Sequence, residues 1–263
     1  MSKLVVLGGN GFLGRRICQA GINAGFQVTS LSRSGKPPKL TPLENKTWIE
    51  KVDWKSADIF QPNSYKDELK DAKSVIHSLG ILLENQNYKS SINSNSSILN
   101  EFSNFLKPSN PLTKTSFNSY ESINRDSAVL LAETFQETTT SSNPSFVYIS
   151  ADKGFPGLPK GYINSKREAE QELSSLSNLR SIFIRPGFMF DEVSNQDNLR
   201  TSIKKFVDLA NWGNQSCLGG KIPILNEFIR PTISTQRVAQ AIIYRIQDPD
   251  FNGVVSLEDL LEK

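Results

Sequence analysis

The sequence is poor in the residues that build metal centres, disulfide frameworks and membrane spans. Its 263 residues include one histidine and two cysteines. His77 alone cannot form a histidine-based metal site, and because it lies in an apolar run we expect it to be a hydrogen-bonded core residue. Cys18 and Cys217 lie far apart without metal-ligand spacing, which favours a reducing compartment and no disulfide framework. No apolar run approaches the ~18 residues of a membrane span. We therefore expect no metal and no transmembrane segment, with peripheral membrane association left open.

The chain also has little net charge. Its 30 basic and 27 acidic residues give a net charge of +3. This balance argues against a nucleic-acid partner, which needs a strongly basic surface. The first apolar run begins at residue 3, so we expect no cleavable leader peptide.

What the sequence does have is a glycine-rich turn directly after its first apolar run. Gly8, Gly11 and Gly14 stand between that run and a predicted helix. The order of strand, glycine turn and helix is typical of dinucleotide-binding folds. There the glycines permit a tight turn, let the backbone approach a pyrophosphate and let the helix pack closely, with the pyrophosphate at the helix N-terminus. Other residues of the turn expected to contact the cofactor are Asn10, Phe12, Leu13 and Arg15.

Strand and helix patterns alternate along the rest of the chain. The predicted strands are residues 3–8, 26–31, 47–52, 74–80, 145–150 and 181–185, and the predicted helices are residues 11–24, 64–71, 121–137, 162–176 and 236–247. Strands separated by helices of this length imply right-handed crossovers and a parallel sheet. We therefore predict an α/β fold, a Rossmann-type doubly wound parallel sheet with a small C-terminal substrate lobe.

The domain boundaries follow from changes in composition. Residues 1–186 are predicted to form the Rossmann domain, residues 187–235 the substrate lobe, and residues 236–263 a return to the Rossmann core. Within 84–118, 16 of 35 residues are Asn or Ser; this composition favours a solvated loop insertion, with a lid or partner-docking loop as the alternative. The predicted lobe contains a set of apolar residues that could form an ordinary hydrophobic core; we favour a cavity for an apolar small molecule. These residues are Phe188, Met189, Phe190, Trp212, Leu218, Ile222, Ile224, Leu225 and Phe228.

The cofactor preference is predicted from the end of the second strand. An NAD site usually has an acidic residue there for the ribose 2′-hydroxyl, whereas this chain has Ser32, Arg33 and Ser34. A guanidinium at that place can pair with a 2′-phosphate, and the serines can add donors. We therefore predict NADP(H). Further along, Asp58 and Ile59 are expected near the adenine. The predicted strand 74–80 ends with Ser78, Leu79 and Gly80, which are expected near the cofactor's ribose.

Two residues of the predicted helix 162–176 are candidates for proton transfer. Tyr162 and Lys166 are four residues apart, so they share one helix face. Lys166 can stabilise a tyrosinate and bond the nicotinamide ribose, while Tyr162 exchanges a proton with the substrate oxygen.

These motifs together resemble the short-chain dehydrogenase/reductase superfamily in its extended or atypical branch. The resemblance rests on the glycine turn, Asp58, Asn124, Tyr162 with Lys166, the strands 75–77 and 146–150, and the turn Arg185, Pro186 and Gly187, which the family places near the nicotinamide. The family's catalytic serine or threonine falls at Ser150; if the register falls on Ala151 instead, that hydroxyl is missing.

A finer pattern points to a narrower group. Residues 8–18, 32–35, 148–152 and 230–234 resemble fungal mitochondrial accessory proteins of coenzyme Q biosynthesis, relatives of the nucleotide-binding accessory subunit of respiratory complex I. That resemblance implies the matrix side of the inner mitochondrial membrane and the other coenzyme Q biosynthesis enzymes as partners. Three functions stay open: an NADP-dependent oxidoreductase acting on a quinone-type or other apolar substrate, a cofactor-bound assembly or regulatory subunit without catalysis, and a sugar-nucleotide epimerase or dehydratase.

Overall fold

The central element is one parallel sheet. A computed structural model of the protein describes residues 1–40, 44–80, 119–153, 160–193 and 230–262. In these residues seven strands pair in the order β3-β2-β1-β4-β5-β6-β9, and every pairing is parallel. The strands are β1 (Lys3–Leu7), β2 (Gln27–Ser32), β3 (Asp53–Ser56), β4 (Ala72–His77), β5 (Ser145–Ile149), β6 (Arg180–Ile184) and β9 (Gly253–Val255). The predicted doubly wound parallel sheet is confirmed.

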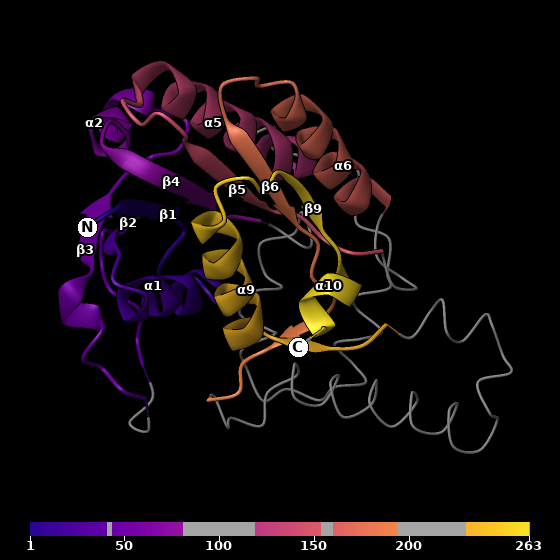
Figure 1. The fold of residues 1–263 in the computed structure, drawn as a ribbon, viewed down its shortest axis with the longest axis horizontal. Helices are drawn as coiled ribbons and strands as arrows, with labels where there is room; N and C mark the ends of the chain where they lie inside the picture. Colours follow the sequence, from indigo (N-terminus) through magenta and orange to yellow (C-terminus); the bar gives the residue numbers. More distant parts are fainter. Residues whose placement is uncertain (41–43, 81–118, 154–159, 194–229, 263) are drawn as a thin grey trace, which may run out of the picture.

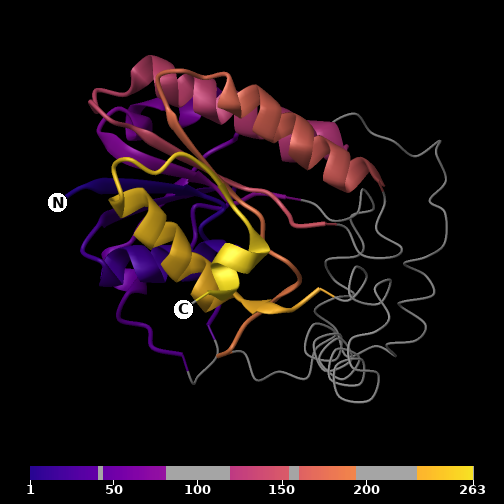
Figure 2. The same ribbon diagram turned by 45° about the vertical axis from the view of Figure 1, so that its right-hand side comes forward.

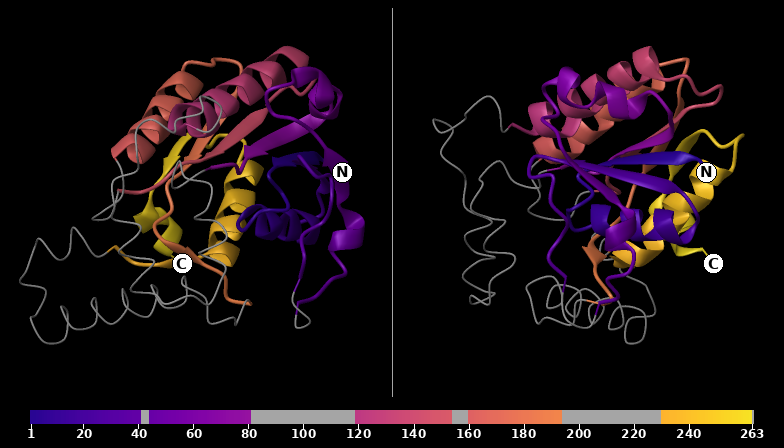
Figure 3. Two further views of the ribbon diagram at one scale, coloured as in Figure 1. Left: turned by 180° about the vertical axis from the view of Figure 1, so that it is seen from behind. Right: turned by 90° about the vertical axis from the view of Figure 1, so that its left-hand side faces the viewer.

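Helices cover both faces of the sheet. Helix α1 (Gly14–Asn23), α9 (Thr235–Gln247) and the short α10 (Leu257–Leu261) lie on one face, and α2 (Lys66–Leu69), α5 (Ser127–Thr138) and α6 (Lys160–Ser174) lie on the other (Figure 1). The same two layers remain separate when the molecule is turned (Figure 2) and when the sheet is viewed from its β3 side (Figure 3). Leu4 and Val6 of β1 belong to the core on the α1 side, and Val5 and Leu7 to the core on the α5 side. Residues 4–7 of β1 are all apolar because both faces of the strand are buried there.

The order of the strands reverses at β1. From β1 the chain builds outward through β2 and β3, then returns to place β4 on the other side of β1. Ligands of open α/β sheets bind beyond the carboxyl ends of the strands at such a switch point. Residues 8–14 follow β1 and residues 78–80 follow β4, so both predicted cofactor segments leave the sheet there.

The predicted strand 47–52 is wrong. Residues Ile49–Lys51 form a 3-10 helix, η1, and β3 begins only at Asp53. The apolar residues that suggested a strand are instead used to anchor this turn: Trp48 is buried in the core, and the Trp54 indole donates to the Ile49 carbonyl at 3.0 Å. Strand β3 was hidden because an edge strand exposed to solvent has a polar sequence.

Two predicted helices also differ from expectation. The predicted helix 64–71 contains a 3-10 turn, η2 (Pro62–Ser64), at its start and only one α-helical turn, α2. The predicted helix 121–137 begins as a π-helix, η5 (Glu121–Asp126), before continuing as α5. Single π-helical turns are rare and occur frequently at functional sites; this one lies beside the candidate catalytic lysine.

The predicted lobe is described only at its two roots. Strand β7 (Met189–Phe190) pairs in parallel with β8 (Ile233–Ser234), whereas most of the predicted apolar cavity and the predicted 84–118 insertion lie outside the described residues. Residues 253–255 supply the edge strand β9 of the main sheet. Within the described ranges, no helix has the length and apolarity to cross a membrane, and no group of acidic, cysteine or histidine side chains is arranged to hold a metal.

Candidate dinucleotide site and catalytic pair

The glycine turn closes tightly on itself. A β-carbon at Gly14 would lie 2.1 Å from the Gly8 carbonyl oxygen, and Gly8 has a φ of +81° that side chains disfavour. Gly11 differs from both, because it is exposed and a β-carbon there would meet only the Gly8 oxygen, at 3.0 Å. Gly8 and Gly14 are therefore required by the turn itself, while Gly11 leaves an open face where a pyrophosphate fits. Phe12 is half-buried and Leu13 is buried at the start of α1.

A fourth glycine, Gly9, was missed as a site residue. A β-carbon there would lie 2.3 Å from the Ser30 hydroxyl and 2.8 Å from the Cys18 sulfur. The turn thus presses against both β2 and α1, and the adjacent pair of glycines in the sequence was the available signal. Burial raises the pKa of the Cys18 thiol, and its sulfur donates weakly to the Gly9 carbonyl; Cys18 is a packing residue.

The turn after β2 lies against the glycine turn. The Asn10 amide donates to the Ser34 hydroxyl at 3.1 Å, and the Gly35 N–H donates to the Ser32 hydroxyl at 3.2 Å. Gly35 has a φ of +60°, and a β-carbon there would lie 2.7 Å from the backbone nitrogen of Ser56. The side chains of Arg33 and Ser34 are exposed. The structure therefore brings together Asn10 and the three residues predicted to recognise a 2′-phosphate.

The segments after β3 and β4 complete the predicted adenosine and ribose side. The Asp58 carboxylate accepts hydrogen bonds from the Phe60 N–H and the Gln61 amide, both at 3.1 Å, so it shapes its own turn. Ile59 is buried in the core on the α5 side. Leu79 packs on the glycine turn, since a β-carbon at Gly8 would lie 2.9 Å from its side chain. The Ser78 N–H continues the sheet by donating to the Leu7 carbonyl.

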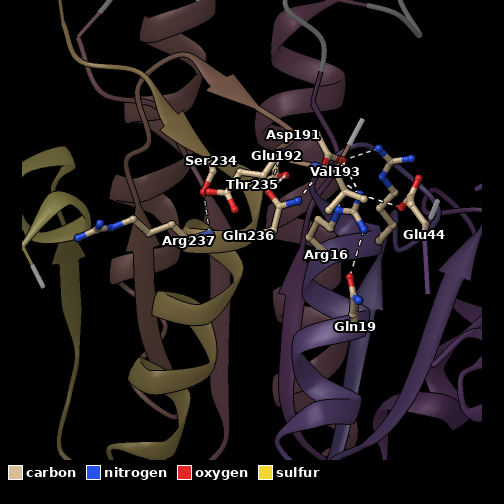
Figure 4. A network of polar contacts seen from close by, with 11 residues as sticks. Arg16, Gln19, Glu44, Asp191, Glu192, Val193, Ser234, Thr235, Gln236 and Arg237 are labelled. Carbon is tan, nitrogen blue, oxygen red and sulfur yellow. Dashed lines mark hydrogen bonds and ion pairs between the residues drawn. The ribbon is translucent and has the colours of Figure 1, made fainter. Parts of the chain in front are cut away.

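Arg15 is held by a buried carboxylate. Figure 4 shows Asp191, just after β7, at the centre of a polar network. Its oxygens lie 2.5 Å from a guanidinium nitrogen of Arg15 and 2.8 Å from one of Arg16, and the Gln236 amide donates to it at 2.7 Å. Arg16 also pairs with Glu44 at 2.8 Å. The side chains of Arg16 and Asp191 are each only 2% exposed.

The arginines decide the charge of Asp191. Burial raises its pKa, but the hydrogen bonds from Arg16, Arg15 and Gln236 outweigh burial and hold the pKa below its ordinary value. Asp191 follows β7 and Gln236 begins α9, so the two roots of the predicted lobe meet at one carboxylate that also holds the first turn of α1. Sequence patterns gave no signal for this ion pair, because 176 positions separate Arg15 from Asp191.

Lys166 is buried directly beneath Gly80. The residue is 2% exposed. Its ammonium donates to the carbonyl of Ile149, the last residue of β5, at 2.8 Å. A β-carbon at the exposed Gly80 would lie 3.4 Å from the ammonium nitrogen. Burial lowers the pKa of Lys166 to about 7, with Glu170 acting in the opposite direction. The predicted ribose segment and the predicted lysine are therefore neighbours.

Tyr162 and Asn124 flank this lysine. Tyr162 lies one turn earlier on α6, half-buried, with its ring edge-on to Tyr120 at 6.3 Å between centroids. Asn124 is fully buried in the π-helix; its amide nitrogen donates to the Ser165 hydroxyl at 3.3 Å, and its side-chain oxygen lies 3.5 Å from a β-carbon built at Gly80. Residues from η5, α6 and the loop after β4 thus lie close together, and their role in a reaction stays a prediction.

The Ser150 hydroxyl is used by an arginine. Ser150 is buried after β5 and accepts a hydrogen bond from Arg167 at 3.0 Å. The same guanidinium donates to the Ala151 carbonyl at 2.8 Å and to the Asp152 carbonyl at 3.1 Å. The sequence analysis did not identify these contacts between Arg167 and the loop after β5, although Arg167 directly follows Lys166. A catalytic role for Ser150 stays a prediction.

The predicted nicotinamide turn after β6 is fixed by similar contacts. Arg185 pairs with the buried Glu170 of α6. The Pro186 carbonyl accepts the Asp152 N–H at 2.9 Å, and a β-carbon at Gly187 would lie 2.9 Å from the Pro231 carbonyl oxygen. The turn therefore contacts both the β5 loop and the second root of the predicted lobe.

The chain is similar to known proteins in sequence and in fold. The chain shares 47% identity over 273 residues with MIOREX complex component 2 of Saccharomyces cerevisiae, covering 99% of both proteins. Among solved structures, MoeE5 in complex with UDP-glucuronic acid and NAD matches 97% of this chain and 75% of its own, with a TM-score of 0.58 and 15% identity. A tyrosine-to-phenylalanine variant of ElxO with NADPH bound matches 99% of both chains, with a TM-score of 0.57 and 13% identity. No family model matches the chain.

The fold is a Rossmann-type doubly wound parallel sheet, and proteins solved with NAD or with NADPH share it. At 47% identity over its full length, the chain belongs to the family of the yeast MIOREX complex component 2.

Proposed function

We propose that the protein is an NADP(H)-dependent oxidoreductase that supports ubiquinone biosynthesis. The observation that carries the proposal is the placement of Lys166, whose buried ammonium lies 3.4 Å from a β-carbon built at the exposed Gly80, on the same helix as Tyr162. A buried lysine with a pKa near neutrality has no use in stability alone, since burying it costs free energy. Perturbed groups of this kind cluster at functional sites.

The described residues fit a nicotinamide dinucleotide. Gly11 leaves an open face at the N-terminus of α1, where backbone N–H groups favour a pyrophosphate, and Gly80 leaves room for a ribose above Lys166. The bound cofactor would supply or accept the hydride. Lys166 would bond the ribose and stabilise a tyrosinate, and Tyr162 would exchange the proton with the substrate oxygen.

The preference for NADP(H) rests on the turn after β2. Arg33 and Ser34 are exposed there, and the Asn10 contact holds the turn beside the glycine loop. A guanidinium forms charge-assisted bonds with a phosphate. Titration of the purified protein should show NADPH binding about tenfold or more tightly than NADH, the size of one such contact. Equal affinities would overturn the assignment.

The cellular role extends the family membership. The relative's name makes that protein a component of a complex, and the sequence resemblance favours coenzyme Q biosynthesis enzymes as partners on the matrix side of the inner mitochondrial membrane. The substrate would be a quinone-type or other apolar ring compound. The predicted apolar residues of the lobe support this, as does the half-buried pair of aromatic rings Tyr120 and Tyr162 at the site.

Deletion of the gene followed by rescue tests the function. Mass spectrometry should show prenylated precursors accumulating after deletion, and wild-type protein should restore ubiquinone. Rescue with Tyr162→Phe should lower output ~10²-fold, the usual size of a positioned acid–base contribution, while the protein still binds NADPH. Tyr244→Phe is the matched control, because this tyrosine is exposed on α9 and should rescue fully.

The alternative is a cofactor-bound subunit without catalysis. It is favoured by the Ser150 hydroxyl, which already bonds Arg167, and by the relative's place in a complex. In that case Tyr162→Phe rescues fully, whereas Gly11→Val, which obstructs the pyrophosphate face, does not. The sugar-nucleotide activity is the least supported of the three, since MoeE5 is 15% identical and the likeness extends to the fold alone.

A further inference from the structure

Tyr148 connects the parts of the site that lie beneath Lys166. It is fully buried near the end of β5, with its ring centroid 4.7 Å below the Lys166 ammonium. Its hydroxyl donates to the Asn124 carbonyl at 2.5 Å, inside the π-helix η5. One residue therefore contacts the ammonium with its ring face and the irregular helix turn with its hydroxyl.

The ring is an uncommon partner for a buried cation. Among the described residues no carboxylate lies within ion-pair distance of the Lys166 ammonium, which bonds the Ile149 carbonyl. Glu170 acts on it only from farther away and is itself paired with Arg167 and Arg185. In a desolvated pocket, the negative face of an aromatic ring contributes more to the stability of a cation than it does in water.

The titratable neighbours on β4 and β5 do not add charge. On β4, His77 lies 5.6 Å from the Tyr148 ring, and burial followed by the Lys166 charge lowers its pKa to about 3. The Ser127 hydroxyl donates its proton to the Ile123 carbonyl at 2.7 Å, so it can only accept from the Nε2–H of His77. With its low pKa, His77 is neutral at neutral pH. Burial raises the pKa of Tyr148 well above its ordinary value, so it stays a phenol. On α6, Tyr162 and the ion pair of Glu170 with Arg167 also act on Tyr148.

We propose that Tyr148 is a positioning residue that favours the charged form of Lys166. Its ring face stabilises the ammonium, and its hydroxyl fixes the π-helical turn at Asn124. The consequence for reactivity rests on the proposed function, in which the Lys166 charge serves the ribose and Tyr162. The effect on Lys166 itself is independent of any reaction.

The experiment measures the protonation of Lys166 directly. Protein labelled with ¹³C-lysine is titrated by NMR without cofactor or substrate, and the Lys166 signal is assigned by its loss in Lys166→Met. Tyr148→Leu removes ring and hydroxyl and should lower the Lys166 pKa by about one unit, a tenfold change in protonation. Tyr148→Phe keeps the ring and should leave that pKa in place, while it lowers the melting temperature because the buried Asn124 carbonyl loses its partner.

A shape-matched replacement covers the case in which Tyr148→Leu does not fold. Pentafluorophenylalanine at position 148 keeps the ring and reverses its face polarity, so it should lower the Lys166 pKa relative to Tyr148→Phe. An unchanged pKa in the fluorinated protein, or an equal shift in Tyr148→Phe and Tyr148→Leu, would overturn the proposal. If the pKa responds as expected but no variant alters ubiquinone output, the positioning role stands and the proposed catalysis fails.

Discussion

Two buried charges in this molecule are stabilised in opposite ways. The Asp191 carboxylate lies among Arg15, Arg16 and Gln236, and its pKa falls below the ordinary value. The Lys166 ammonium contacts a carbonyl oxygen and an aromatic ring, and its pKa falls to about 7. Both shifts are downward, but for an acid this favours the charged form and for a base it favours the neutral form.

The difference separates a structural charge from a chemical one. Asp191 stays ionised throughout the neutral range, so it can hold three elements together without changing state. Lys166 lies near its midpoint at neutral pH, so small changes in its surroundings alter its charge. A paired carboxylate therefore stabilises the fold, whereas a lysine without an ion-pair partner is available for proton-coupled chemistry.

The largest expected effect comes from breaking the structural charge. Asp191→Asn removes the carboxylate that pairs with Arg15 and leaves Arg16 with Glu44 alone. Because a buried ion pair loses one partner, the change should cost about 3 kcal/mol of unfolding free energy. Because the folded pKa is depressed, the Asp191 contribution is present above its ordinary pKa and is lost as pH falls through the folded pKa. Urea unfolding at neutral and acidic pH measures both effects. Asp53→Asn, at an exposed ion pair with Lys55, is the control and should cost less than about 1 kcal/mol.

Removing the Lys166 charge should affect function strongly and stability little, the reverse of what is expected for Asp191. Lys166→Met should leave the unfolding free energy unchanged or raise it, because a buried ammonium is replaced by an apolar chain. Ubiquinone output should fall ~10²-fold and NADPH affinity about tenfold. Denaturation and cofactor titration are run on the same sample, with the partly exposed Lys55→Met as control. A large loss of stability in Lys166→Met would make Lys166 a second structural charge and contradict the comparison.

Substitution of His77 tests whether a neutral group near Lys166 limits the pH range in which the folded protein is stable. Its folded pKa of about 3 lies below the ordinary 6.5, so its contribution to stability is complete above 6.5 and is lost as pH falls toward 3. Between neutral pH and about pH 5 the wild type should lose about 2 kcal/mol from this residue. His77→Gln retains a donor for Ser127 and should lose less over the same interval. Parallel pH–stability curves for the two proteins would show that His77 is not responsible.

The smallest expected effect separates the two arginines predicted at the cofactor. Arg33→Ala should weaken NADPH binding about tenfold and leave NADH binding unchanged, since it removes a contact to the 2′-phosphate. Arg15→Ala should mainly lower stability, because Arg15 bonds Asp191. Titration of both cofactors against both variants distinguishes them. A selective loss of NADPH affinity in Arg15→Ala would assign the phosphate contact to Arg15.

The parts predicted from sequence are those specified over short stretches of chain. The glycine turn, the pair Tyr162 and Lys166, and the strands with continuous apolar runs depend on neighbours a few positions away. The sequence did not predict strand β3, because its polar residues lie at an exposed sheet edge. It did not predict the π-helix either, whose Asn124 carbonyl accepts a hydrogen bond from Tyr148, a residue 24 positions away. The Asp191 network joins residues 176 positions apart, and no local pattern specifies such a pairing.

The meeting of both lobe roots at Asp191 has a consequence for how this protein can vary. Met189 pairs with Ile233, and the Gln236 amide is fixed to Asp191, so the chain between these points begins and ends at one anchored place. The entropy of closing such a segment grows only slowly with its length, by about 0.6 kcal/mol for each doubling. A change in the number of residues between the two roots should therefore cost the sheet and the glycine turn little free energy.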